Sequence, residues 1–336
     1  MRKRSAPPLT LRRTVLVSAL LFAGLACVSL AALSIGSVSI SLRDVLASLT
    51  LDPSVADAQR MIVLELRLPR VILAIIVGAG LSVAGLVFQA LLRNPLAEPY
   101  ILGISSGGTM GAILAMSLAG GASAFATPLA SFAGSAAVML LVYAVARRHG
   151  RLDPYTLLLS GVMIGAFFNA AVLLVIAIVN QELRSAFLWL MGNLRTATPT
   201  AAVIVGPPVV IACTLFLWQA KAFNLIATGE ETAMQLGVNV AAVKKFAYLL
   251  ASFVTGLVVS VSGVIGFVGL IIPHMCRMLF GPDHRLLIPA SFLLGGTFLV
   301  GADLIARTVL APTEIPVGAV TAAIGAPLFV YLLKRN

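Results

Sequence analysis

Ten apolar segments, separated by short polar connections, limit what this sequence can fold into. The first, residues 14–35, would extend about 33 Å as a helix, which is enough to cross the roughly 30 Å hydrocarbon core of a bilayer. Cleavable signal peptides have a shorter apolar region of about 7–15 residues, so this segment is predicted to be the first membrane helix. The expected helices cover residues 14–35, 68–91, 101–119, 124–146, 156–179, 200–219, 241–264, 266–280, 286–307 and 317–333.

The charge content agrees with a chain that is embedded in lipid. Only 10% of the 336 residues are charged and 60% are hydrophobic, whereas soluble domains carry about 25% charged residues. No linker or polar block is long enough to fold separately. We therefore predict one all-α integral membrane domain over residues 1–336, with ten transmembrane helices.

The basic residues predict the orientation of the chain. In the ten-helix arrangement, sixteen of the 23 lysines and arginines fall on the side that holds both termini. Because basic residues accumulate on the cytoplasmic side, both termini are expected in the cytoplasm, with the protein in the inner membrane. The net charge of +11 is thus interpreted as membrane anchoring rather than nucleic-acid binding. The seven on the outer side are Arg43, Arg60, Arg67, Arg70, Arg184, Arg195 and Arg307.

Neither a metal site nor a hydrolytic site is indicated. Cys27, Cys213 and Cys276 lie in apolar runs without the spacing of metal ligands or of a disulfide framework. The segment 103–107, GISSG, matches the G-x-S-x-G pattern, but that pattern needs a strand before it and a histidine base. Its flanks are expected to be helical, so an intramembrane hydrolase is disfavoured and the glycines are expected to pack helices together.

The source of energy is expected to lie outside this chain. No P-loop occurs, and within the spans Asp303 is the main charged residue, one turn before Arg307, with which it can pair. Transporters driven by ion gradients usually carry ionisable groups or broken helices near the midplane. A secondary transporter without an ATPase remains the alternative.

The longest cytoplasmic connection, residues 225–245, contains the signals of a short helix. Thr228 and Glu231 fit a capping box, Gly237 is placed to end the helix, and Asn239 can cap the next one. A helix of about two turns is not stable alone in water, so it must pack either on a partner or on its own membrane domain.

Four stretches resemble one family, the permease subunits of type II ABC importers for iron-siderophores, haem and cobalamin (the FecCD type). The resemblance runs from about Arg67 to the C-terminus. The stretches are LRLPRVILAIIVGAGLSVAGLVFQALLRNPLAEPYILGISSGG, GEETAMQLGV, GFVGLIIPHMCRMLFGPDHRLLIP and EIPVGAVTAAIGAPLFVYLL.

The resemblance implies a permease that performs no covalent chemistry. It implies pairing with a second permease copy as a homodimer, or else with a close relative, and the translocation path would lie between the two. Two cytoplasmic ATPase subunits, which bind ATP and magnesium, would drive transport, and a periplasmic binding protein would deliver the chelate. No cofactor is expected in this chain. A ferric siderophore is favoured because such members are the most numerous, while haem and cobalamin stay open.

The resemblance also implies roles for particular residues. Three outward arginines would meet acidic residues of the binding protein: Arg67, Arg70 and Arg307. A cytoplasmic gate along the path would be formed by Asn94, Pro95 and Leu96 and, before the fifth helix, by Pro154 and Tyr155. Coupling to the ATPase would fall to Gly229, Glu230, Glu231, Ala233, Leu236 and Gly237.

Overall fold

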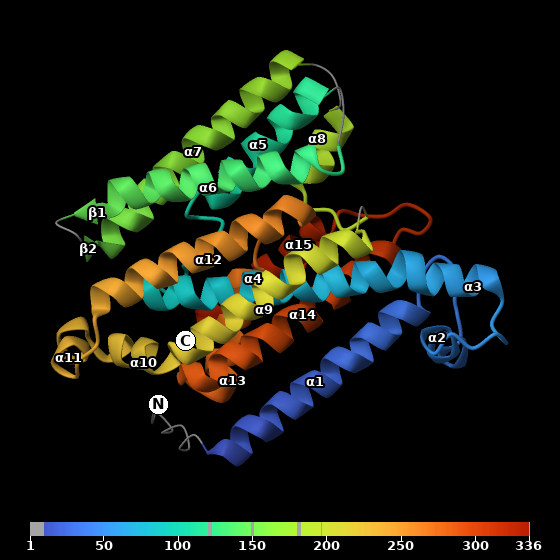
Figure 1. Cartoon of the computed structure of the whole chain (residues 1–336), viewed down its shortest axis with the longest axis horizontal. Coiled ribbons are helices and arrows are strands. Elements are labelled where there is room, and N and C mark those ends of the chain that lie inside the picture. The colour runs from blue at the N-terminus through green and yellow to red at the C-terminus, as the bar shows by residue number, and fades with distance from the viewer. Residues whose placement is uncertain (1–9, 120–122, 149–150, 180–182, 196, 336) are drawn as a thin grey trace.

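The computed structural model describes residues 10–119, 123–148, 151–179, 183–195 and 197–335. Within these ranges, each of the ten predicted segments is a helix (Figure 1). Seven of the described helices are long and apolar enough to cross a membrane, while α5, α13 and residues 317–332 of α15 are shorter apolar helices. The ten are α1 (Leu11–Ser34), α4 (Leu68–Leu92), α5 (Ile104–Ala119), α6 (Ala126–Ala146), α7 (Pro154–Val179), α9 (Pro199–Trp218), α12 (Val240–Ser262), α13 (Val268–Phe280), α14 (His284–Thr308) and α15 (Val317–Arg335).

Several short elements connect these helices at the two ends of the bundle (Figure 1). A π-helical segment joins α3 to α4, so that helix runs without interruption from Asp57 to Leu92. We call the end with α10 and α11 the α11 end and the opposite end the α2 end. The short elements are α2 (Leu42–Leu49), α3 (Asp57–Met61), η1 (Ile62–Arg67), β1 (Arg147–Arg148), β2 (Arg151–Leu152), α8 (Leu183–Leu190), α10 (Ala220–Thr228) and α11 (Glu230–Gln235).

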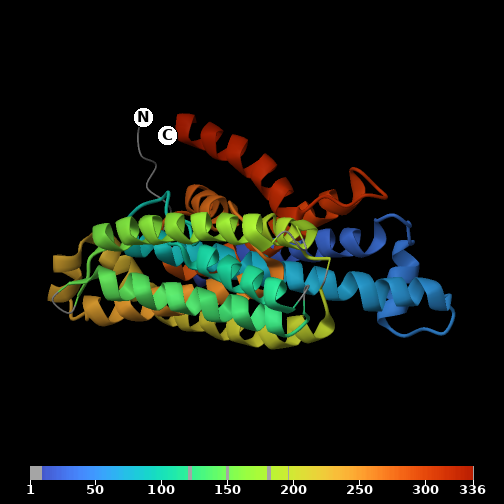
Figure 2. The ribbon, with the colours of Figure 1, turned by 90° about the horizontal axis from the view of Figure 1, so that it is seen from above.

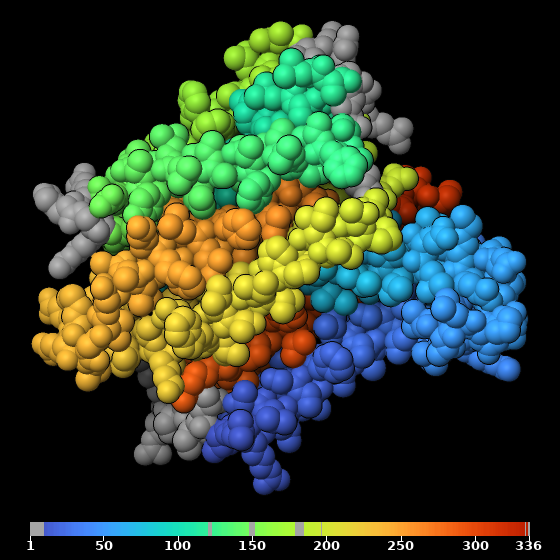
Figure 3. Space-filling model, viewed as in Figure 1, coloured from blue at the N-terminus to red at the C-terminus, as the bar shows by residue number. Residues whose placement is uncertain are grey.

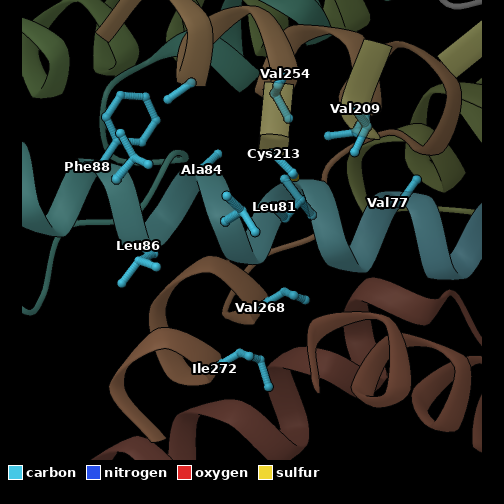
Figure 4. Packing of buried hydrophobic residues seen from close by; sticks show 14 of the residues in the cluster. Val77, Leu81, Ala84, Leu86, Phe88, Val209, Cys213, Val254, Val268 and Ile272 are labelled. Carbon is cyan, nitrogen blue, oxygen red and sulfur yellow. The ribbon is translucent and has the colours of Figure 1, made fainter. Parts of the chain in front are cut away.

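Helix α4 forms the centre of the core. Twenty of its 25 residues are buried, as expected for a helix that is apolar on every side. It packs against α9, α12, α13 and α14. Figure 4 shows side chains of α9, α12 and α13 gathered around it, among them Val209, Val254 and Val268. Helices α5, α6 and α7 form a second group on the far side of α12 (Figures 1 and 3).

Glycines let the helices approach backbone to backbone. A Cβ atom added at Gly85 of α4 would lie 1.9 Å from the carbonyl oxygen of Gly269 in α13. One added at Gly111 of α5 would lie 2.0 Å from the carbonyl oxygen of Ala130 in α6. The predicted packing role of the glycines is therefore confirmed. The GISSG segment enters α5 from a turn, and no strand precedes it in the described residues.

Helix α15 lies apart from the rest of the bundle. Seen from above, it diverges from the other helices after its first turns (Figure 2). Near its end, Val330 is 65% exposed and Tyr331 is 57% exposed. One face of α15 packs on α13, as the contact of the Phe329 and His274 rings shows, while the apolar face that carries Val330 and Tyr331 is left without a partner within the described part of this chain.

Candidate functional site

The turn after α4 holds the first predicted gate residues. Arg93 ends the helix in the left-handed conformation, with φ 50°. The Oδ1 atom of Asn94 then accepts a hydrogen bond from the N–H of Leu96 at 2.9 Å, which closes a tight turn. Pro95 is exposed, and Leu96 is 41% exposed at the α11 end.

The chain then returns into the bundle and is fixed to α13. Glu98 is 9% exposed, and its Oε1 atom accepts the N–H of Phe267, the N-cap residue of α13, at 3.0 Å. Because Pro273 has no N–H, the carbonyl of Gly269 loses its helical partner, and the Nε2 atom of Gln89 lies 3.4 Å from that oxygen. Neither polar residue was given a role from the sequence, although each stands out in an apolar stretch.

The second predicted gate segment lies at the same end, where α7 begins (Figure 1). Pro154 is the first residue of α7, and the carboxylate of Asp153 accepts the backbone N–H of Thr156 at 2.7 Å, as a cap does. Tyr155 is 74% exposed. Among the described residues, no hydrogen bond joins Tyr155 to the turn of Asn94.

The predicted coupling segment forms a pair of short helices, α10 and α11, that meet at Gly229. This glycine has φ 149°, and Gly237 ends α11 with φ 84°, so both occupy conformations that favour glycine. Glu231 is exposed, as are Met234 (43%) and Leu236 (62%). Ala233, in contrast, is fully buried within the chain, so Leu236 is the predicted apolar contact residue that α11 presents to solvent.

The predicted capping box at this helix is wrong. Thr228 is the last residue of α10, where its hydroxyl donates to the carbonyl of Leu225 at 2.7 Å, and the N-cap of α11 is Gly229. The hydroxyl is thus used by the preceding helix, a common alternative for threonine. The predicted cap of α12 is confirmed, because Asn239 Oδ1 accepts the N–H of Ala242 at 3.1 Å.

Substitution of these two residues should therefore have unequal effects. Asn239→Ala is expected to lower the free energy of unfolding by about 1 kcal/mol, because it removes a cap, whereas Thr228→Ala should stay within about 0.5 kcal/mol. Thermal unfolding in detergent measures the difference, and hydrogen exchange should accelerate at the Ala242 amide only in Asn239→Ala. Equal effects of the two substitutions would show that Thr228 does cap α11, as the capping box predicts.

Polar contacts also tie α10 to the start of α14. Asn224 donates to Asp283 Oδ1 at 2.8 Å and accepts the N–H of His284 at 2.9 Å. Hydrogen bonds from Arg285, and from Asn224, lower the pKa of Asp283 to about 2, so this carboxylate stays ionised at neutral pH. The helix pair α10–α11 is therefore attached to the core by specific bonds.

Glu230, the first residue of α11, is engaged inside the chain. Its Oε1 atom lies 2.5 Å from Lys244 Nζ of α12 and 3.5 Å from an Arg93 Nη2 atom. A cavity of about 270 Å³ opens beside it, bordered by residues of α11 and α12 and by Leu152. Of the two adjacent acids, Glu231 is thus the one that faces solvent.

At the α2 end the three outward arginines lie together but buried, each less than 10% exposed. The guanidinium of Arg70 donates to both oxygens of Asp303 at 2.9–3.0 Å and to Glu314 at 3.0 Å. The predicted pair of Asp303 and Arg307 is confirmed, with Oδ2 and Nε 3.2 Å apart. Glu314 also binds Arg195, whose side chain is 49% exposed; the sequence placed Arg195 on the outer side but gave neither residue of this pair a role.

Two of these arginines also hold the end of α1. Arg307 donates to the carbonyl of Ala32 at 3.0 Å, and Arg67 donates to the carbonyls of Leu33, Ser34 and Val38. The last carbonyls of a helix have no partner within it, so these bonds cap α1 from outside. Within this chain, Arg67, Arg70 and Arg307 donate to acceptors inside the protein. Arg195, which pairs with Glu314 beside them, has a solvent-exposed side chain.

Comparison with known families and proteins gives consistent matches. The FecCD transport family model matches residues 22–335. The chain is 43% identical to the cobalamin import system permease of Halobacterium salinarum over 280 residues, which cover 83% of this chain and 75% of that one. It is 40% identical to the hemin transport system permease of Yersinia pestis over 318 residues, 93% of each chain.

A solved structure matches the fold over nearly its whole length. This structure, of a metal-chelate type ABC transporter in an inward-facing conformation, superimposes with a TM-score of 0.86 at 31% identity. The match covers 96% of this chain and 100% of the other. The arrangement of ten helices therefore agrees with a known transporter architecture.

Proposed function

Because this chain belongs to the FecCD transport family, whose model matches residues 22–335, we propose that it moves a ferric siderophore from a periplasmic binding protein to the cytoplasm. The coarser part of this function is established by the comparisons: the chain is a multi-pass membrane protein and the permease subunit of an ABC importer for metal chelates. It is not itself the ATPase.

The proposed contact with the ATPase rests on the short length of α11 and on the residues that it exposes. This six-residue helix is too short to be stable alone, yet it is fixed to the bundle and presents Glu231, Met234 and Leu236 outward. An apolar pair beside a carboxylate suits a groove with basic residues at its rim. We therefore assign the contact with the ATPase to this face of α11, flanked by Gly229 and Gly237.

The proposed orientation places the α11 end in the cytoplasm and the α2 end in the periplasm. Sixteen of the 23 basic residues belong to the cytoplasmic side in this arrangement, as the positive-inside tendency requires. An ATPase contact on α11 requires the same orientation. Both termini then lie in the cytoplasm, with the protein in the inner membrane.

A second permease copy and a binding protein complete the proposed assembly. The unpartnered surface of α15 supports pairing with a second copy, with the path between the two and with Asn94, Leu96 and Tyr155 near its cytoplasmic end. The binding protein is proposed to meet the α2 end, where Arg67, Arg70 and Arg307 organise the surface and Arg195 is exposed.

The cargo is tested by transport into proteoliposomes that contain the permease, its ATPase subunits and its binding protein. Labelled ferric siderophore, haem and cobalamin are supplied separately with internal ATP. We expect ATP-dependent accumulation of the ferric siderophore, at least tenfold above that of the other two. Accumulation of haem or cobalamin instead would refute the cargo while leaving the importer function intact. The hemin and cobalamin transporters among the relatives make these the two informative competitors.

A further inference from the structure

Arg93 occupies a position that ordinarily favours glycine. Its φ of 50° and ψ of 34° place it in the left-handed region at the C-terminus of α4, where a side chain costs free energy that glycine does not. Helices often end with glycine at such a position. At this position the chain thus carries a long basic side chain in place of glycine.

The guanidinium of Arg93 reaches both helices of the α10–α11 pair. Its Nη2 atom donates to the carbonyl of Ile226, near the end of α10, at 3.1 Å. The same atom lies 3.5 Å from Oε1 of Glu230, the first residue of α11. Arg93, which directly precedes Asn94, thus connects the two short helices to the end of α4.

Glu230 is shared between two cations on different elements. Its Oε1 atom receives the ammonium of Lys244 from α12 as well as the guanidinium of Arg93. The Lys244 side chain is only 5% exposed, so this ion pair provides a buried ammonium with a hydrogen-bond acceptor. One carboxylate oxygen therefore joins the end of α4, the start of α11 and the first turns of α12.

The far end of the same turn is also fixed. Glu98 binds the first residue before α13 through the N–H of Phe267, at 3.0 Å. The turn that contains Asn94 and Leu96 is consequently held at two points, one on α11 and one on α13. Because Arg93 directly precedes Asn94, its contacts with α10 and α11 act at the first residue of this turn.

We infer that Glu230 is a positioning residue that transmits movement of α11 to the turn of Asn94, through Arg93, and that it does not contact the ATPase. This inference rests on the proposed function and assigns the route from the ATPase contact to the gate. Lys244 holds the carboxylate in place from α12, and Glu231 is left to face the partner.

The test is a double-mutant cycle in the assembled complex, with cargo transported per ATP hydrolysed as the readout. Arg93→Gln and Glu230→Gln should each lower this ratio about tenfold, while the ATPase subunits still co-purify with the permease. The double variant should be no worse than Glu230→Gln alone, because the two residues act through one contact. Lys221→Gln, which removes an exposed positive charge on α10, is the matched control and should leave the ratio unchanged.

A distance measurement separates this role from a merely structural one. Spin labels at Leu96 and Gln235, both exposed, should keep one distance with and without ATP in an otherwise unchanged complex, because the turn and α11 move together. In Glu230→Gln the distribution should broaden, or should shift with nucleotide.

Three outcomes would overturn the inference. Loss of the ATPase from Glu230→Gln would place this carboxylate on the partner. Additive losses in the double variant would show that the two residues act independently. An unchanged transport ratio in both single variants would show that movement does not pass through this contact. If the unaltered complex itself fails to transport with ATP, the proposed function falls together with the inference.

Discussion

Replacing Asp303 by asparagine is expected to lower the free energy of unfolding by about 3–5 kcal/mol, as is typical when one partner of a buried ion pair is removed. The carboxylate is 2% exposed and serves two arginines at once, Arg70 through three hydrogen bonds and Arg307 through an ion pair. Without its charge, two buried guanidinium groups would face each other. Thermal unfolding of the purified permease in detergent measures the loss.

Asp57→Asn provides the control for this substitution. Asp57 lies at the same end and pairs with Arg60 at 3.7 Å, but its side chain is fully exposed, so its loss should not shift the unfolding temperature measurably. Because Arg67 and Arg307 hold the end of α1, Asp303→Asn should also accelerate hydrogen exchange in the last turn of α1. An unfolding temperature equal to that of the unaltered protein would show that the arginine cluster is not a structural centre.

Gly85→Ala is the second substitution with a large expected effect. Even a methyl group here would sit 1.9 Å from the Gly269 carbonyl oxygen and 2.6 Å from that residue's carbonyl carbon, all backbone atoms that cannot rotate away. Helices α4 and α13 would have to separate, at a cost of about 3 kcal/mol or more. The amount of folded, monodisperse permease recovered from membranes should fall accordingly, and Gly85→Val should be worse.

Gly24→Ala is the matched control for that change. No atom lies within 4 Å of a Cβ at this position on α1, so alanine should be tolerated and could gain up to about 1 kcal/mol from helix propensity. Equal recovery of Gly85→Ala and Gly24→Ala would mean that α4 and α13 are not in backbone contact.

The long helices could be predicted because their signal is local. Each is an apolar run, and seven of the described helices reach the length that a bilayer requires, so all ten could be located from the sequence alone. The short elements α2, α3, α8 and α10 were missed, as was the π-helical segment before α4. Such short helices depend on packing against distant residues, which a single sequence does not reveal.

In the candidate site, too, local contacts could be predicted from the sequence and long-range contacts could not. Asn239 was identified as a cap because a cap lies within three residues of its acceptor. The bond of Arg70 to Asp303 spans 233 positions, and that of Glu98 to Phe267 spans 169, so neither pairing could be read from spacing. The prediction that Thr228 caps α11 was wrong for a different reason, because its hydroxyl donates instead to a carbonyl of the preceding helix.

The most direct test of the account is the source of energy for transport. Vesicles are reconstituted with the permease, its ATPase subunits and its binding protein. Cargo is supplied outside the vesicles, and its uptake is measured under two conditions. In the first, ATP is present and ionophores collapse all ion gradients. In the second, a proton or sodium gradient is imposed and the ATPase carries a substitution that abolishes hydrolysis. An ATP-driven importer is expected to take up cargo in the first condition and none in the second. Uptake driven by the gradient without ATP hydrolysis would contradict it.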